Sequence, residues 1–274
     1  MSNCTKAIIA VAGYGTRRLP ISKTIEKCML PFGNRPVVDY VVQDCIVAGI
    51  EDIYFVIGEQ STQIRDYYRT NIDLKDYLIN NKKHELLPLI QPPKIKLHYV
   101  IQPSYGKRGT ADAISRVVPL IPEGESVVVL GGDDCIYRED GVSEVARLIE
   151  AAGEGSSVLG VRVDPTRVSS YGVLESDADG NFVSIVEKPA VEDAPSNMIN
   201  ISKYVFDYRL LQLTEQYVKE AQPEGEYYIT EPINQYVRDG GKMKIVPAEG
   251  EYLDSGRVEN WIAGNNWLLE HGQL

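Results

Sequence analysis

Three segments of this sequence carry side chains whose types and spacing suit phosphate chemistry. Residues 12–18 (AGYGTRR) combine glycines, which let backbone N–H groups converge on an anion, with two arginines. Residues 131–134 (GGDD) and 252–256 (YLDSG) place aspartates in short glycine-containing segments. Mg²⁺ prefers a few hard carboxylate oxygens together with phosphate oxygens and water. These segments therefore predict a site for a divalent ion and a phosphorylated substrate.

The glycine loop differs from two familiar phosphate-binding loops. A dinucleotide-binding fold would need G-x-G-x-x-G, but Arg18 stands in the place of the third glycine. A P-loop would end in Gly-Lys-Ser/Thr, which is also absent here. An ordinary glycine turn with two solvated arginines is the remaining alternative to a phosphate site.

The two aspartate segments lie far apart in the chain. Asp133 follows a buried strand expected at residues 126–130, and Asp254 is expected in a turn just before a helix. Each aspartate taken singly is also typical of a turn or a helix cap, and Asp134 is ambiguous in the same way. The spacing alone does not show that the carboxylates meet.

Strand and helix patterns alternate in the first half of the chain. Apolar runs predict strands at residues 6–12, 52–58, 96–102 and 126–130, while helical spacing predicts helices at 36–48 and 111–120. We therefore predict an α/β fold with a Rossmann-like, mostly parallel (mixed) sheet flanked by helices. The loops at 12–18 and 131–134 then open at the carboxyl edge of that sheet, where ligands bind.

The second half is richer in strands. A polar, helical insertion is expected at residues 70–95, and strands are expected at 157–163, 171–176, 183–187, 200–206 and 243–247. Helices are expected at about 208–219 and 230–239 and from Val258 onward. With no repeat or linker in view, we expect a single domain over residues 1–274, made of halves at about 1–135 and 136–274.

Composition and charge argue against nucleic-acid and membrane partners. The net charge of −11 and the pI near 4.9 predict a surface that repels nucleic acid. No apolar stretch is long enough to span a membrane and no signal peptide is visible, so we expect no membrane partner and a cytoplasmic location. Four cysteines without a C-x-x-C pair and three scattered histidines predict neither a disulfide framework nor histidine chemistry.

The order and spacing of several motifs resemble the bacterial sugar-1-phosphate nucleotidylyltransferases, and among these the UTP–glucose-1-phosphate uridylyltransferases. The matching segments cover nearly the whole chain: residues 13–17 (GYGTR), Lys23, 27–31 (KCMLP), 48–50 (AGI), 70–95, 171–173 (YGV), 187–189 (EKP) and 194–197 (APSN). The resemblance implies a nucleotide-diphospho-sugar transferase fold. It also implies transfer of a uridylyl group from UTP to glucose 1-phosphate, with Mg²⁺ as cofactor and UDP-glucose and pyrophosphate as products.

The resemblance assigns roles to individual residues as well. The catalytic group would be Arg17, Lys27, Asp133, Lys188 and Asp254, with the metal held by Asp133 and Asp254. The nucleotide would be bound by Ala12, Gly13, Gly15, Thr16, Arg17, Gln102, Gly109 and Thr110. The sugar phosphate would be bound by Gly172, Glu187, Lys188 and Glu226.

Three segments depart from the uridylyltransferase pattern. Residues 109–113 (GTADA) resemble the ADP-glucose and UDP-N-acetylglucosamine pyrophosphorylases, residues 225–230 (GEYYIT) resemble the N-acetylglucosamine-1-phosphate enzymes, and Gly132 replaces a proline. A thymidylyl- or uridylyltransferase for another sugar 1-phosphate, including N-acetylglucosamine 1-phosphate, therefore stays open. A catalytically silent, sugar-nucleotide-binding regulatory subunit is the alternative from another class. In each case we expect small-molecule partners, and the family leads us to expect a homo-oligomer.

Overall fold

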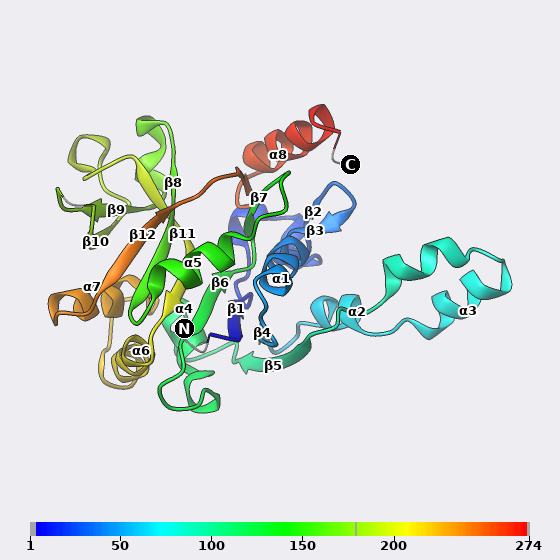
Figure 1. The fold of residues 1–274 in the computed structure, drawn as a ribbon, viewed down its shortest axis with the longest axis horizontal. Coiled ribbons are helices and arrows are strands. Elements are labelled where there is room, and N and C mark those ends of the chain that lie inside the picture. Colours follow the sequence, from blue (N-terminus) through cyan, green and yellow to red (C-terminus); the bar gives the residue numbers. More distant parts are fainter. Residues whose placement is uncertain (1–3, 179, 273–274) are drawn as a thin grey trace.

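The computed structural model describes residues 4–178 and 180–272, which form helices on both faces of a mixed β-sheet (Figure 1). The strands of this sheet are β1 (Lys6–Ala10), β4 (Asp52–Gly58), β5 (Lys96–Gln102), β6 (Val127–Gly131), β8 (Ser156–Arg162), β9 (Gly172–Ser176), β10 (Phe182–Glu187), β11 (Met198–Phe206) and β12 (Met243–Pro247). Two short two-stranded sheets accompany it: β2 (Pro31–Phe32) with β3 (Arg35–Pro36), and β7 (Asp134–Tyr137) with β13 (Glu251–Asp254). The helices are α1 (Val37–Val47), α2 (Gln63–Tyr68), α3 (Ile72–Asn80), α4 (Thr110–Ser115), α5 (Glu144–Ala152), α6 (Tyr208–Glu220), α7 (Thr230–Arg238) and α8 (Val258–Glu270).

Four strands from the first half form the parallel part of the sheet, in the order β6-β1-β4-β5. The central residues of β6, β1 and β4 are almost all buried, and these three strands are continuous apolar runs, whereas β5 at the edge of the sheet is mostly half-buried. The segments that follow β1 and β6 leave the sheet at the same edge because these two strands are neighbours and parallel. The predicted α/β fold with a mixed, helix-flanked sheet is confirmed.

Strand β11 connects the two halves of the chain. It pairs antiparallel with β6 on one side and with β8 and β9 on the other, and β12 adds to β8 in parallel. The sheet order is therefore β10-β9-β11-β6-β1-β4-β5, with β8 and β12 branching from β11. One sheet thus runs through both halves.

Alternate residues of β1 enter different cores, as the pleat requires. Ala7 and Ile9 pack with the side that contains α1, α5 and α8, whereas Ile8 packs with the side that contains α4, α6 and α7. All four cysteines are buried and free, as the sequence predicts. No helix among residues 4–178 and 180–272 is long and apolar enough to cross a membrane.

Two expectations about local structure are wrong. The helix expected at 111–120 ends at Ser115, and a separate 3₁₀ turn follows at Val118–Leu120, because Pro119 lacks an N–H and disfavours a helical residue before it. Asp254 does not lie in a turn but ends β13, where it pairs with Asp134 of β7. A strand of only four residues leaves too little alternation in the sequence to be recognised.

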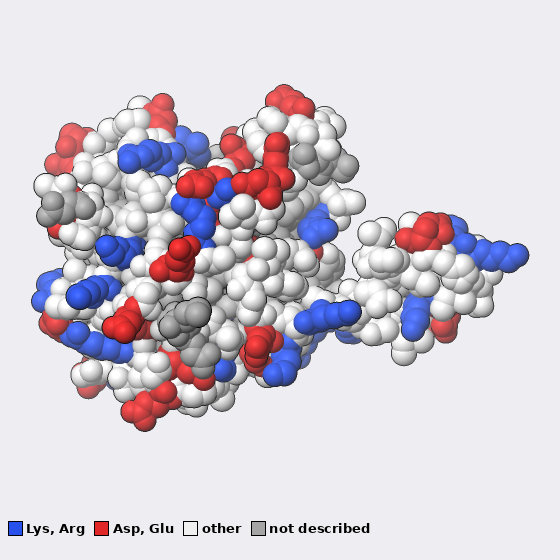
Figure 2. Space-filling view, viewed as in Figure 1, with Lys and Arg blue, Asp and Glu red and all other residues white. Residues whose placement is uncertain are grey.

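The insertion at 70–95 is helical, as predicted, and consists of α3 followed by a 3₁₀ helix at His84–Ile90. It projects from the body of the molecule as an arm (Figure 1). On the face shown in Figure 2, acidic and basic side chains are interspersed over the body, and basic side chains gather at the end of the arm.

Candidate active site

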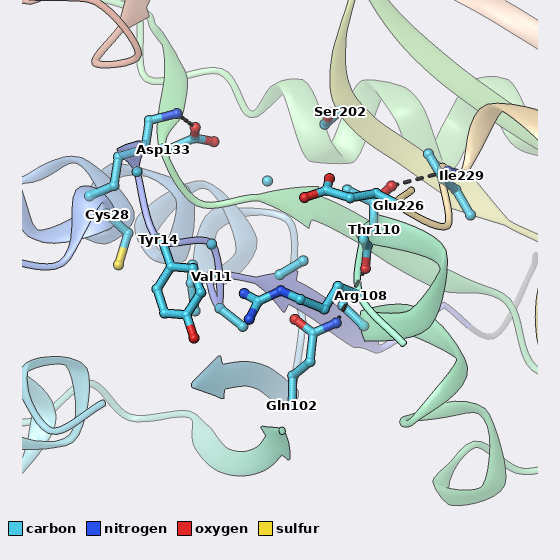
Figure 3. Close-up of a pocket in the computed structure, with 18 of the residues that line it drawn as sticks. Val11, Tyr14, Cys28, Gln102, Arg108, Thr110, Asp133, Ser202, Glu226 and Ile229 are labelled. Carbon is cyan, nitrogen blue, oxygen red and sulfur yellow. Dashed lines mark hydrogen bonds and ion pairs between the residues drawn. The ribbon is translucent and has the colours of Figure 1, made fainter. Parts of the chain in front are cut away.

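A cavity of about 410 Å³ opens at the carboxyl edge of the parallel strands (Figure 3). Its walls come from the loop after β1, the ends of β5 and β6, the start of α4 and the segment before α7. Eleven of the residues predicted from the sequence line it: Ala12, Gly13, Gly15, Thr16, Arg17, Lys27, Gln102, Gly109, Thr110, Asp133 and Glu226. Segments that are far apart in the chain therefore converge on one space.

The glycine loop at residues 12–18 packs directly on Lys27. Gly15 has φ = 61°, and a Cβ atom at this position would stand 3.1 Å from the Cβ of Lys27. The Ser22 hydroxyl donates a hydrogen bond to the Gly15 carbonyl at 2.8 Å and holds the loop in this place. Glycine is needed here both for the left-handed backbone and for the close approach.

Lys27 and Asp133 form an ion pair within the cavity. Burial alone would raise the pKa of Asp133, but the Lys27 ammonium outweighs it and the pKa is lowered. Burial alone would likewise lower the pKa of Lys27, yet the Asp133 carboxylate raises it. Both groups are therefore held in their charged forms, which suits them to bind a phosphate and a cation.

The structure brings the Asp254 segment against Asp133. The backbone N–H and the hydroxyl of Ser255 donate to the Asp133 carbonyl at 3.2 and 2.6 Å, respectively. The carboxylate of Asp254 accepts hydrogen bonds from Asn260 at 2.6 Å and from Tyr171 at 3.3 Å. Asp254 itself stands outside the lining of the cavity.

Asp133 and Asp254 carry the type of ligand atom that Mg²⁺ prefers. Both side chains offer hard carboxylate oxygens, and that of Asp133 is 38% exposed, so a ligand can reach it. Within the described residues, no cluster of three or more histidine, cysteine, aspartate or glutamate side chains could enclose an ion. An ion at this place would therefore need substrate phosphate oxygens and water to complete its shell, which is how Mg²⁺ binds in nucleotide enzymes.

Asp134, ambiguous in the sequence, faces the protein interior. Lys203 donates to its carboxylate at 2.7 Å and to its carbonyl at 3.1 Å, and Tyr252 donates to it at 2.9 Å. Burial raises the pKa of Asp134 to about 6. Lys203 was missed in the sequence, although a lysine within the apolar strand 198–206 is a signal that it needs a buried partner.

The opposite end of the cavity is lined by Gln102, Gly109 and Thr110. Gly109 has φ = 111°, and a Cβ atom there would lie 2.5 Å from the Tyr227 carbonyl. This glycine is therefore required by packing against residue 227, a reason that the sequence does not reveal. The hydroxyl of Thr110 accepts a hydrogen bond from the Ile229 N–H at 3.0 Å and ties the same two segments together.

Two side chains that sequence analysis missed lie at this end as well. The guanidinium of Arg108 stacks over the Tyr14 ring at 4.2 Å and donates to the Ser104 carbonyl at 3.1 Å. The hydrogen bond from Arg108 lowers the pKa of the exposed Tyr14 hydroxyl. An exposed aromatic–arginine pair beside a cavity offers a stacking surface for a planar ligand.

Gly172, Glu187 and Lys188 stand outside the lining of the cavity. Gly172 and Glu187 pair across β9 and β10, and the Lys188 N–H donates to the Tyr171 carbonyl at 3.0 Å. Burial raises the pKa of Glu187. The Tyr171 hydroxyl also donates a hydrogen bond to the Asp254 carboxylate, so Tyr171 links the β9–β10 pair to Asp254.

The alternative of two solvated arginines is wrong for Arg18. Its side chain is buried and lies over the ring of Trp261 in α8 at 5.2 Å. Arg17, by contrast, is exposed and lines the cavity. Trp261 donates to the Pro31 carbonyl at 2.6 Å, so α8 is anchored to the segment that carries Lys27.

Comparison with known proteins gives a consistent result. The model of the nucleotidyl transferase family matches residues 6–271. A UTP–glucose-1-phosphate uridylyltransferase of Pseudomonas aeruginosa is 30% identical over 272 residues, covering 97% of this chain and 96% of the relative. A putative enzyme of the same name from Bacillus subtilis is 35% identical over 265 residues, covering 94% of each chain.

Solved structures agree with the sequence relatives. The UTP-bound UGPase from Acinetobacter baumannii superposes with a TM-score of 0.85 at 28% identity, covering 99% of this chain and 95% of the other. A UDP-glucose pyrophosphorylase complexed with UDP-glucose gives a TM-score of 0.82 at 28% identity, covering 98% and 99%. The fold, the cavity and these relatives together show that the chain belongs to the nucleotidyl transferase family.

Proposed function

We propose that this protein transfers a uridylyl group from UTP to glucose 1-phosphate and forms UDP-glucose and pyrophosphate, with Mg²⁺ as cofactor. The observation that carries the proposal is the cavity itself, which has charged groups at one end and a buried amide with a stacking surface at the other. Such a site suits a nucleoside triphosphate lying along it. The choice of glucose 1-phosphate as the sugar substrate and of UTP as the nucleotide follows the activities named for the relatives.

In the proposed reaction, a phosphate oxygen of glucose 1-phosphate attacks the α-phosphorus of UTP. The bond between the α-phosphorus and the bridging oxygen breaks, and pyrophosphate leaves with that electron pair. The nucleophile is already an anion, so the site needs no general base or covalent intermediate. A bound Mg²⁺ would neutralise negative charge on the phosphates.

The side chains of this chain would mainly position and neutralise the substrates. Lys27 and Arg17 lie on the cavity wall, where they would hold the triphosphate and stabilise charge on the pyrophosphate. Lys188 would bind the sugar phosphate, and Glu187 would accept hydrogen bonds from sugar hydroxyls. The half at about 1–135 would thus bind the nucleotide and the half at 136–274 the sugar phosphate, within one domain.

Two alternatives remain tied to specific residues. The GTADA segment at 109–113 and the GEYYIT segment at 225–230 favour N-acetylglucosamine 1-phosphate or another sugar phosphate as second candidate acceptor. A silent regulatory subunit would be expected to lose a metal aspartate or a phosphate lysine, and it is disfavoured because Lys27, Asp133 and Asp254 are all present. The homo-oligomer remains a prediction from the family resemblance, and the cytoplasmic location remains a prediction from the sequence.

A substrate panel tests the proposal. Purified protein is incubated with UTP, dTTP, ATP or CTP and with glucose 1-phosphate or N-acetylglucosamine 1-phosphate, and pyrophosphate release is measured. We expect the highest kcat/KM for UTP with glucose 1-phosphate, loss of turnover with EDTA and recovery with Mg²⁺. A clear preference for another sugar phosphate would replace the acceptor, and tight nucleotide binding without turnover would favour the regulatory subunit.

A further inference from the structure

Gln102, at the end of β5, lines the cavity with a side chain whose orientation is fixed by its neighbours. The residue is 6% exposed, and its Nε2 donates to the Asp112 carboxylate at 2.7 Å and to the Gly109 carbonyl at 3.3 Å. Both amide hydrogens are therefore used on the protein side. The Oε1 atom is left as the group that the amide offers to a ligand (Figure 3).

Asp112 determines which end of the amide faces the protein. It lies in the first turn of α4 and is 2% exposed, and its two carboxylate oxygens receive Arg116 Nε and Nη2, each at 3.0 Å. A carboxylate held in this way accepts hydrogen bonds and cannot donate one. Rotating the Gln102 amide would set its oxygen against two acceptors, the carboxylate and the Gly109 carbonyl, and would leave buried polar groups unpaired.

An amide that presents only its oxygen to the cavity discriminates between pyrimidines. Uracil and thymine carry an N–H at N3, which can donate to Oε1. Cytosine has an unprotonated N3, which is an acceptor, and its donor on this edge is the neighbouring N4 amino group. In the position where the N3–H of uracil meets Oε1, cytosine therefore sets two acceptors against each other, and it can satisfy the buried oxygen only by shifting along the site, which weakens its binding.

We propose that Asp112, clamped by Arg116, is a positioning residue that fixes Gln102 as a hydrogen-bond acceptor and so selects uracil or thymine nucleotides over cytosine nucleotides. The inference rests on the proposed function only in that the cavity binds a nucleoside triphosphate. Neither Asp112 nor Arg116 touches the base, and they act through the Gln102 amide. The GTADA segment at 109–113, set apart by sequence analysis, thereby gains a physical role.

The central experiment is the ratio of kcat/KM for UTP to that for CTP. We expect the wild-type protein to favour UTP by at least about tenfold, the value of one discriminating hydrogen bond. In Asp112→Asn the new amide can donate as well as accept, so Gln102 can rotate and the ratio should fall by about tenfold. Arg116→Lys keeps a positive charge beside Asp112, and the Asp112 carboxylate still accepts the hydrogen bond from Gln102. The UTP-to-CTP ratio should therefore stay at its wild-type value even if the melting temperature falls.

A double-mutant cycle separates positioning from general structural damage. In Gln102→Leu the reading group is gone, and adding Asp112→Asn to this variant should not change the ratio further. A purely structural role for Asp112 would lower turnover with UTP and CTP alike and would leave the ratio unchanged. Thermal unfolding of each variant shows whether it is folded.

Nucleotide binding can be measured without turnover, and it tests the inference independently of the proposed reaction. Calorimetric titration of UTP and CTP into the wild-type protein should show tighter binding of UTP, whether or not any sugar phosphate is turned over. Equal affinity and equal kcat/KM for the two nucleotides in the wild type would overturn the proposal. So would a folded Asp112→Asn variant with the wild-type ratio. Absence of turnover together with preserved UTP preference would reject the proposed reaction and leave this inference standing.

Discussion

The two ends of the cavity are stabilised in opposite ways. At the end that we propose binds the phosphates, here called the phosphate end, Lys27 and Asp133 pair with each other, and the Asp133 side chain is 38% exposed. At the end that we propose binds the base, here called the base end, the group that faces the cavity is a neutral amide, and its charged support, Asp112, is only 3% exposed in its side chain. In the proposed reaction the charges of the first end would exchange partners when substrates bind, whereas the amide of the second end is already held by the Asp112–Arg116 ion pair.

This difference predicts different kinetic consequences. Substituting a group that neutralises charge developed during the reaction should mainly lower kcat. Substituting a group that is held rigid before binding should mainly change the preference among nucleotides. Substitutions at each end of the cavity test this division.

Replacing Asp254 or Asp133 with alanine should lower kcat by about 10³-fold or more, because the ion that neutralises the phosphates loses one of its two protein carboxylates. Pyrophosphate release at saturating substrates measures the effect. Asp76→Asn, at an exposed position of α3 in the arm, is the matched control and should keep wild-type turnover. Near-wild-type kcat in Asp254→Ala would remove that residue from the metal site.

Lys27→Met should lower kcat by about 10²- to 10³-fold, since a cation positioned on the transferring phosphates is worth that much in comparable sites. The UTP dissociation constant, measured by calorimetry, should change much less than kcat. If UTP binding weakens as much as kcat falls, Lys27 contributes uniform binding and the contrast between the two ends is lost.

Lys203→Met should lower the free energy of unfolding by about 3–5 kcal/mol, because it leaves the buried Asp134 carboxylate without its charged partner. Denaturant unfolding measures this loss. Lys203→Arg keeps the charge and should recover much of the stability. A methionine variant as stable as the wild type would show that the pair beneath the phosphate end contributes little to the fold.

Glu187→Gln should raise KM for glucose 1-phosphate by about tenfold, because hydrogen bonds from sugar hydroxyls to a carboxylate are stronger than those to an amide. KM for UTP should stay within about twofold. An equal rise in both constants would mean that β10 supports the whole cavity rather than the sugar alone.

The central parallel strands β1, β4 and β6 were predictable because their interiors are buried and continuous in apolar residues. The loop at 12–18 and Asp133 were predictable for a related reason, since each directly follows such a strand. The pairing of β7 with β13 was not, because four-residue strands carry little periodicity and their partners lie more than a hundred residues apart.

Side-chain partnerships were the least visible feature in the sequence. Nothing local indicates that Asp112 supports Gln102, that Lys203 neutralises Asp134, or that Arg18 is buried on a tryptophan. Each depends on a contact made only after the sheet has brought distant segments together. Sequence thus identified groups that line the cavity, and the structure identified those that hold them in place.

The central claim is that Asp133 and Asp254 share one divalent ion when nucleotide is bound. Titration of Mn²⁺ into the protein with saturating UTP, followed by electron paramagnetic resonance, tests it most directly. We predict one tightly bound ion per chain, and at least about tenfold weaker binding in Asp133→Asn and in Asp254→Asn. Unchanged Mn²⁺ affinity in the double variant would contradict the account.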